Sequence, residues 1–165
     1  GTYAADQLFA TLDTTVRKLY VADAQPMVAS DTVGFVRALP HELVQAFKAT
    51  LLEAVESDLL LHIVDGASDQ REQQIEAVNM VLAEIGAADI PQLIVVNKCH
   101  LLGLGADAGR VELDENGDVH RVFVSAKTGA GIPELRAALQ ARFPRQNTVY
   151  SFDQTVDEPP NPAAQ

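Results

Sequence analysis

Two adjacent pairs of polar residues close an apolar stretch of this sequence. Residues 94–102 read IVVNKCHLL, in which Asn97 and Lys98 end the apolar run and Cys99 and His100 follow. A Cys–His pair can contribute to a metal site, whereas an Asn–Lys pair offers hydrogen-bonding groups to a ligand. The sequence raises both kinds of chemistry at the same point.

Zinc coordination is the weaker of these two possibilities. Zinc sites usually collect four ligands at recognisable spacings, and this sequence has one cysteine and four scattered histidines. Adjacent residues on an extended chain also tend to point in opposite directions. We therefore expect Cys99 to be a small apolar packing residue, and His62, inside LLLHIVD, to be a packed core histidine.

Four short apolar runs share the feature that polar residues end them. The runs end at Asp31, at Asp65 with Gly66, at Asn97 with Lys98, and at the segment 125–127. The middle two are almost continuously apolar, which predicts parallel strands covered on both faces. Because open α/β sheets bind ligands at the carboxyl ends of parallel strands, we expect these polar residues to share one rim.

Helical patterns separate the strands. Apolar residues recur three or four apart in the stretches 41–56, 70–86 and 131–143. Asp69 and Glu72 have the spacing of a capping box, Gly86 suits a helix end, and Pro133 suits a first turn. The alternation of strands and helices predicts an α/β fold.

Two further pairs of strands are expected. Residues 111–124 have the pattern of a hairpin, with Asn116 and Gly117 in a tight turn. The segments 15–23 and 25–31 could pair as adjacent strands. Residues 145–165 are polar, acidic and proline-containing, and we expect them to form a disordered tail after a domain that covers residues 1–144.

Composition excludes some classes of function. The 165 residues suit one domain, and 23 acidic against 12 basic residues give a formal charge of −11. This balance carries no direct signal for nucleic-acid or anionic-membrane binding. No window has the roughly 18–20 apolar residues of a membrane span, the start has no signal-peptide pattern, and a single cysteine allows no internal disulfide. A cytoplasmic location is expected.

The strand-end motifs resemble those of the P-loop GTPase superfamily. DTVGF at 31–35, NKCH at 97–100 and SAK at 125–127 agree in order and spacing with its D-x-x-G, N-K-x-D and S-A-K motifs. The stretches 3–19 and 31–65 are more specifically similar to the HflX family of ribosome-associated bacterial GTPases. The resemblance covers about residues 3–143. It implies a three-layer sandwich with a mostly parallel sheet, GTP hydrolysis, GTP and GDP as ligands, and action on the large ribosomal subunit.

The resemblance also implies the nucleotide-binding residues and the cofactor. Mg²⁺ would accompany GTP, held by Thr11 of the switch segment and by Asp31 through water, while the Gly34 amide would meet the terminal phosphate. The implied GTP-binding residues form four segments: Phe9, Ala10, Thr11, Leu12 and Asp13; Asp31, Thr32, Val33 and Gly34; Asn97, Lys98, Cys99 and His100; and Ser125, Ala126 and Lys127.

Base recognition falls to the last two segments of that set. By resemblance, the Asn97 amide bonds the base edge and ties neighbouring loops together, and the Lys98 stem packs over the ring. The Ala126 amide would donate to the guanine carbonyl, and Ser125 and Lys127 would shape its loop. The pattern SAKTGAGIP is in addition a glycine-rich lead into a helix.

The chain departs from the family in three places. His100 stands where the family has an aspartate that accepts both guanine-edge hydrogens; a degenerate copy, a relaxed base preference and a sequence error all explain it. Phe35 stands where many relatives have a water-orienting glutamine, so the catalytic residue is unassigned and slow hydrolysis is expected. No G-x-x-x-x-G-K-[ST] phosphate loop occurs in the sequence.

The missing loop leaves alternatives open. The economical account is an incomplete P-loop GTPase domain that runs from the switch segment onward, without the first strand, the phosphate loop and the first helix. By itself such a piece is expected to be inactive. The alternative is a non-catalytic, nucleotide-free relic or interaction module on a GTPase scaffold. An unrelated flavodoxin-like binding domain is a weaker third possibility, which the combined motifs disfavour.

Overall fold

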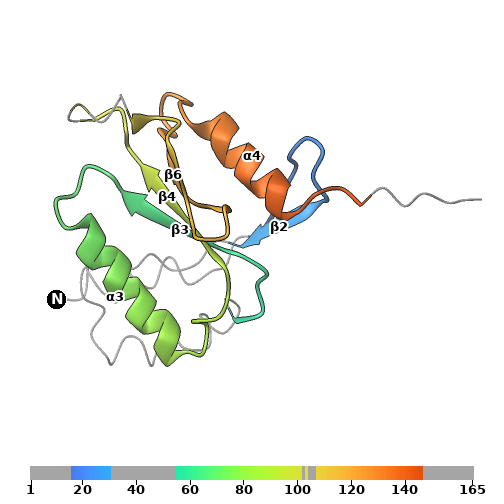
Figure 1. Ribbon diagram of the computed structural model, residues 1–165, viewed down its shortest axis with the longest axis horizontal. Helices are drawn as coiled ribbons and strands as arrows, with labels where there is room; N and C mark the ends of the chain where they lie inside the picture. The colour runs from blue at the N-terminus through green and yellow to red at the C-terminus, as the bar shows by residue number, and fades with distance from the viewer. Residues whose placement is uncertain (1–15, 31–54, 102, 104–106, 147–165) are drawn as a thin grey trace, which may run out of the picture.

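A mixed four-stranded sheet forms the centre of the molecule (Figure 1). The computed structural model describes residues 16–30, 55–101, 103 and 107–146. In these ranges the sheet has the order β3 (Leu60–Asp65), β4 (Gln92–Asn97), β6 (Val119–Phe123) and β5 (Val111–Leu113). β3, β4 and β6 run parallel, and only β5 is antiparallel to its neighbour. The prediction of a mostly parallel sheet is confirmed.

Two helices lie on opposite faces of this sheet. α3 (Arg71–Glu84) buries Leu82 in a cluster with Leu60 of β3. α4 (Ile132–Arg142) packs Ala138 and Leu139 against Leu93 of β4. Leu93 is the register partner of Leu61, so it points to the opposite face of the sheet from Leu60. The layers are therefore helix, sheet and helix, as predicted. No helix in the described ranges is long and apolar enough to cross a membrane.

The helix ends agree with the sequence in two of three cases. Gly86 follows α3 with φ of 80°, and Pro133 lies in the first turn of α4. The capping box is wrong: α3 begins after Gln70, and no side chain caps it. The Glu72 carboxylate, which the motif would use, is instead 2.9 Å from Nη1 of Arg121 on β6. That contact ties the helix to the sheet.

The hairpin prediction is confirmed by β5 and β6. Their antiparallel pairing brackets a turn at Gly117, where φ is 83°. Asp114 closes this turn, because its Oδ1 accepts hydrogen bonds from the amides of Asn116 and Asp118 at 2.8 and 3.0 Å. An aspartate side chain that accepts from nearby backbone amides stabilises a turn of this kind.

Within the described residues, β3 is packed on the face toward α3 and exposed on the other, which corrects the expectation of two covered faces. Leu61 and Ile63 are 39% and 57% exposed, although β4 beside them is buried through Leu93, Val95 and Val96. α4 packs on β4 and β6, and in the described ranges β3 has a strand on one side only. Leu61 and Ile63 therefore form an exposed apolar strip next to the open edge of β3 in the described ranges.

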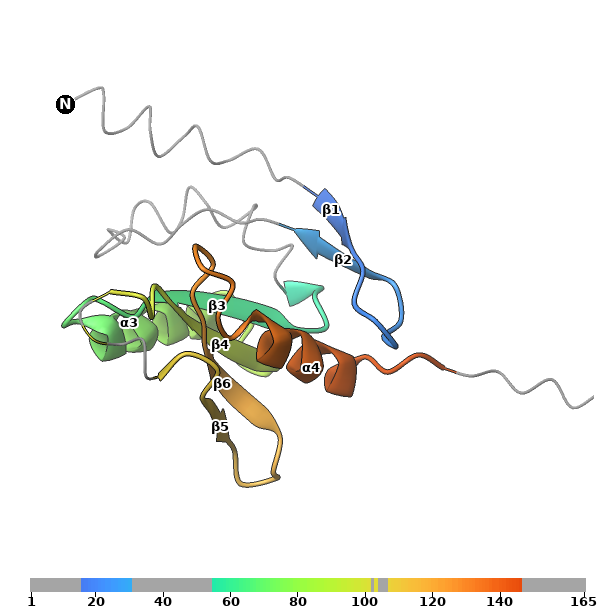
Figure 2. The same cartoon turned by 90° about the horizontal axis from the view of Figure 1, so that it is seen from above.

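A second, two-stranded sheet lies beside the first (Figure 2). β1 (Val16–Leu19) and β2 (Met27–Ser30) pair antiparallel, as predicted. Their connection is held to the end of α4, since the Gln25 amide donates to the Phe143 carbonyl at 3.0 Å and Val21 joins the α4 core cluster. β2 was expected to contribute to the same rim as the other strands, but within the described ranges it pairs only with β1.

Most of the predicted helix at 41–56 and most of the predicted tail at 145–165 lie outside the described residues.

Candidate functional site

Polar residues gather where the three parallel strands end. Asp65 and Asn97 are register partners at the ends of β3 and β4, and Ser125 comes two residues after the end of β6. Because the strands are parallel, their carboxyl ends meet at one edge of the sheet. We call this edge the strand-end rim: Asp65, Asn97, Lys98, His100, Ser125 and Ala126. The predicted common rim is confirmed for these three strands.

Asn97 joins two strand ends. Its Oδ1 accepts a hydrogen bond from the Ala126 amide at 3.0 Å, so the segment after β4 is tied to the segment after β6. The expectation that this asparagine connects neighbouring loops is thereby met in the geometry. The same bond occupies the Ala126 amide, which was expected to donate to a base carbonyl. The roles of Asn97 and Ala126 toward a ligand stay predictions.

Lys98 is held to the neighbouring strand by an ion pair. Its Nζ lies 3.0 Å from Oδ2 of Asp65, and the two side chains are 48% and 42% exposed. The Lys98 hydrogen bond is the main cause that lowers the pKa of the Asp65 carboxyl below its ordinary value of 3.8, and the amide of Ala67 adds to the effect. Lys98 also has φ of 67°, a left-handed conformation that is uncommon for a residue with a Cβ.

Asp65 was expected at the rim as a strand-end residue, but not among the nucleotide-binding residues. Its Oδ2 accepts from Lys98 and its Oδ1 accepts from the Ala67 amide at 3.0 Å, so both oxygens are engaged. The available signal was its place: the run LLLHIVDG ends on a carboxylate in the same way that the next run ends on Asn97. Lys98, 33 positions further along the chain, could not be identified as its partner from spacing.

Gly66 allows the first two strand ends to approach closely. Its amide donates to the Asn97 carbonyl at 2.8 Å. A Cβ at this position would lie 2.7 Å from that same carbonyl oxygen and 2.8 Å from Cγ1 of Val96. A glycine is therefore needed for the backbone contact that sets Asp65 beside Lys98.

His100 bonds to the segment that follows β6. Its Nδ1 lies 2.7 Å from Oγ of Ser125, a residue whose side chain is fully buried. Oγ of Ser125 also accepts the Thr128 amide at 3.2 Å. His100 thus makes a second connection between the same two strand ends that Asn97 joins, and Ser125 shapes its loop as expected.

Cys99 and His62 differ in how far they match the sequence. Cys99 is fully buried with Val96 and Phe123, and its Sγ–H donates to the Val96 carbonyl at 3.4 Å. Burial raises the pKa of this thiol, so it is a packing residue as predicted. His62 is half-buried on β3 rather than in the core, and burial lowers the pKa of its imidazole.

The lead into α4 is built on glycines. Gly129 and Gly131 have φ of 84° and 78°, and the Gly129 amide donates to the Ser125 carbonyl at 2.8 Å. A Cβ on Gly131 would collide with the Phe123 carbonyl oxygen and lie 2.9 Å from Cα of Val124. The predicted glycine-rich lead is confirmed, and it holds the 125–127 segment against the end of β6.

Two of the four predicted nucleotide-binding segments cannot be placed. Phe9 to Asp13 and Asp31 to Gly34, with Phe35, lie outside the described residues, and so do both proposed magnesium ligands, Thr11 and Asp31. Within the described ranges, no three or more His, Cys, Asp or Glu side chains form a group that could hold a metal ion. The structure brings together the other two segments, 97–100 and 125–127.

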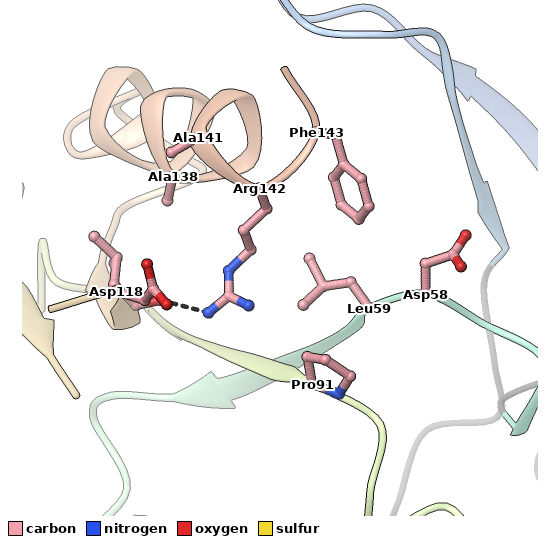
Figure 3. A pocket seen from close by; sticks show the side chains of 9 residues that line it. Asp58, Leu59, Pro91, Asp118, Ala138, Ala141, Arg142 and Phe143 are labelled. Atoms are coloured by element: carbon pink, nitrogen blue, oxygen red, sulfur yellow. Dashed lines mark hydrogen bonds between the residues drawn. The ribbon is translucent and has the colours of Figure 1, made fainter. Parts of the chain in front are cut away.

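A pocket lies at the opposite, amino-terminal end of the strands (Figure 3). It has a volume of about 310 Å³ and is lined by Asp58 and Leu59 before β3, Pro91 before β4, and residues of β6 and α4. Arg142 crosses it, and its Nη2 donates to the Val119 carbonyl at 2.7 Å. This hydrogen bond joins the end of α4 to the start of β6.

Comparison with known proteins agrees with this arrangement. A solved GTP-binding protein from Sulfolobus solfataricus, in complex with GDP, matches this chain over 83% of this chain and 48% of its own, with a TM-score of 0.60. At 22% identity, this likeness shows the fold alone. It agrees with the α/β sandwich described above.

Sequence comparison identifies the family. A family model described as 50S ribosome-binding GTPase matches residues 2–98. GTPase HflX of Escherichia coli is 54% identical over 140 residues, which are 85% of this chain and 32% of that protein. GTPase HflX of Lacrimispora saccharolytica is 42% identical over 92% of this chain. The chain spans about a third of the length of these relatives. The chain belongs to the HflX family of GTPases.

Proposed function

We propose that this chain is the base-recognising part of a GTPase that binds and hydrolyses GTP with Mg²⁺ and acts on the large ribosomal subunit. One observation supports it above the others. Asn97 and Ala126, from segments 29 positions apart, are joined at 3.0 Å on the strand-end rim. The ring of a bound base would lie across these two joined segments, beside the Lys98 stem.

The phosphates require a segment that the sequence does not contain. We propose that a preceding strand with a G-x-x-x-x-G-K-[ST] loop pairs with the open edge of β3. The exposed Leu61 and Ile63 support this proposal, because a further strand and its helix would cover them. The loop would then end at the same rim as Asp65, where backbone amides can cradle phosphates.

Magnesium and the ribosome enter the proposal by family membership. Mg²⁺ bound with GTP would neutralise phosphate charge, and the hydroxyl of Thr11 and the carboxylate of Asp31 have the oxygen chemistry that this ion prefers. The formal charge of −11 argues that contact with ribosomal RNA is confined to a local surface or made by another part of the protein.

A titration with fluorescent GTP and Mg²⁺ tests the phosphate-loop step. This chain alone should show no micromolar binding, and the chain extended upstream by its own gene sequence should bind with micromolar affinity or better. Micromolar binding by the short chain, competed by GTP, would overturn the assignment of phosphate binding to a preceding segment. If neither form binds, the nucleotide-free interaction module becomes the better account.

Co-sedimentation with purified large subunits tests the partner. The extended chain loaded with a non-hydrolysable GTP analogue should pellet with large subunits, and the GDP-loaded form should pellet less. Equal recovery with small subunits alone would contradict the proposed partner while leaving nucleotide binding intact.

A further inference from the structure

Basic side chains gather on the β1–β2 hairpin and on α4. Residues 16–30 and 132–146 together contain five basic and two acidic residues, whereas the whole chain contains 12 basic and 23 acidic residues. The two segments lie against each other (Figure 2), and the Arg136 guanidinium donates to the Tyr20 carbonyl at 3.4 Å. One part of an acidic molecule therefore carries a net positive charge.

We call this surface the hairpin patch: Arg17, Lys18, Tyr20, Arg136 and Arg145. All of these residues are exposed, and Tyr20 is 70% exposed. β1 pairs with β2 on one side, and in the described ranges its other edge has no partner strand. Because successive residues of a strand point to opposite faces, Arg17 and Lys18 place one cation on each face beside this open edge.

The cations of the hairpin patch differ from other cations of the chain in their partners. In the described ranges, no carboxylate forms an ion pair with a cation of the patch. The ion pairs between described residues involve other cations: Lys98 with Asp65, Arg71 with Glu72, Arg110 with Asp107 and Glu112, and Arg121 with Glu72 and Glu112. Carboxylates neutralise those charges locally, whereas the charges of the patch can attract an external anion.

Unpaired cations beside an exposed aromatic ring match the chemistry of RNA. RNA carries one phosphate per nucleotide, and arginine and lysine bind phosphates with release of counterions. Unpaired bases of RNA also stack on exposed aromatic rings, which gives Tyr20 a partner that a purely acidic protein surface would not provide. The formal charge of −11 opposes contact with RNA over the rest of the chain and favours contact at this patch.

We propose that the hairpin patch binds RNA of the large ribosomal subunit. Its four cations contact phosphates, and the Tyr20 ring stacks on an unpaired base. The proposal rests on the proposed function and gives the ribosomal partner a contact surface on this chain. Binding to large subunits should then depend steeply on salt, because each phosphate contact contributes about 0.7–0.9 to the slope of log affinity against log salt.

Co-sedimentation with purified large subunits at about 50–200 mM salt tests the charges, with the extended chain loaded with a non-hydrolysable GTP analogue. The double variant Arg17→Gln/Lys18→Gln should bind about tenfold more weakly and should reduce the steepness of the salt dependence by about 1.5. The matched control Arg71→Gln/Arg110→Gln removes two cations that carboxylates already neutralise. It should keep the affinity within about twofold of the wild type and leave the salt dependence unchanged.

Tyr20→Ala separates stacking from charge. This variant removes the ring and no charge, so it should bind large subunits about tenfold more weakly with the same salt dependence as the wild type. Unchanged affinity would remove the stacking contact from the proposal. Thermal unfolding and a titration with fluorescent GTP show that each variant is folded and still binds nucleotide.

The outcomes separate this surface from the proposed function. If the wild type pellets with large subunits and the two double variants behave alike, the hairpin patch is overturned while the ribosomal partner stands. A weaker Arg17→Gln/Lys18→Gln variant with unchanged salt dependence overturns the phosphate contacts and indicates a ribosomal protein as the partner of the patch. A wild type that does not pellet at any salt concentration overturns both the patch and the proposed partner.

Discussion

The two ends of the central sheet are built differently. At the carboxyl ends of β3, β4 and β6, side chains bond across elements: Asn97 to Ala126, Lys98 to Asp65, and His100 to Ser125. At the amino ends, a pocket of about 310 Å³ has mostly apolar walls and is crossed by one guanidinium, which bonds to a backbone carbonyl. The end with the described cavity is not the end where polar groups converge.

This difference separates the described cavity from the candidate site. Ligand chemistry needs convergent polar groups of defined geometry, and among the described residues the rim has them. At the amino end, the described residues form a stabilising contact between Arg142 and the Val119 carbonyl. Substitutions at the rim are expected to affect ligand binding, and substitutions at the amino-terminal pocket are expected to affect only stability.

Gly131→Ala should have the largest effect. The new methyl group would meet the Phe123 carbonyl and the Val124 backbone, and the residue must keep φ of 78°. We expect the free energy of unfolding to fall by about 3 kcal/mol, from the left-handed conformation together with overpacking. Urea titration followed by circular dichroism measures it.

Gly129→Ala is the matched control for that substitution. Gly129 has nearly the same φ, 84°, but a Cβ there would meet nothing within 4 Å. It should cost only about 1–2 kcal/mol. Equal losses in the two variants would show that the contact with the end of β6 does not hold the 125–131 segment in place.

Asn97→Ala should have the next largest effect, on nucleotide binding. It removes both the amide group expected at the base edge and the acceptor of the Ala126 amide. We expect the extended chain to bind GTP roughly 100-fold more weakly. Gln92→Ala, at the other end of β4, removes an exposed contact with Asn79 and should leave affinity within twofold. Similar losses from both variants would remove the distinction between the two ends.

The rim could be predicted from the sequence in part. Asn97, Lys98 and Ser125 follow apolar runs, and parallel strands bring such ends together whatever the loops between them. The partners could not be predicted. Asp65 reaches Lys98, and His100 reaches Ser125, through tertiary geometry that no local spacing encodes.

The fold shows the same division. The spacing of apolar residues along the sequence predicted β3, β4, α3 and α4, because burial of one or both faces of an element sets that spacing. The capping box failed because Glu72 is drawn to Arg121, 49 positions away, a competition that is not visible locally. The open face of β3 was missed because an apolar run reports what a strand could bury, and not whether a neighbour is present to cover it.

Arg142→Met should affect stability and not binding. It removes the hydrogen bond to the Val119 carbonyl at 2.7 Å while it keeps an apolar stem in the pocket. We expect a loss of about 1.5 kcal/mol in the free energy of unfolding, with unchanged GTP affinity in the extended chain. Arg136→Met, on the same helix, removes an exposed 3.4 Å contact with the Tyr20 carbonyl and should change stability by less than about 0.5 kcal/mol. A fall in GTP affinity with Arg142→Met would assign the amino-terminal pocket a part in ligand binding.

Asp65→Asn should have the smallest effect, and its sign depends on pH. Lys98 lowers the pKa of Asp65 in the folded chain, so the ion pair contributes its full stability above the ordinary value of 3.8 and loses it as the pH falls through the lowered folded value. The exposure of both side chains limits the contribution to below about 1 kcal/mol at pH 7.

Urea titrations at pH 7 and at pH 3 or below should show that the unfolding free energies of wild type and variant converge in acid. At pH 7, 1 M salt should also reduce the difference between them. Asp118→Asn, at the amino-terminal pocket, has no ion pair in the described ranges and should show neither dependence. A difference for Asp65→Asn that persists unchanged in acid would mean that it does not come from the charge of Asp65 beside Lys98.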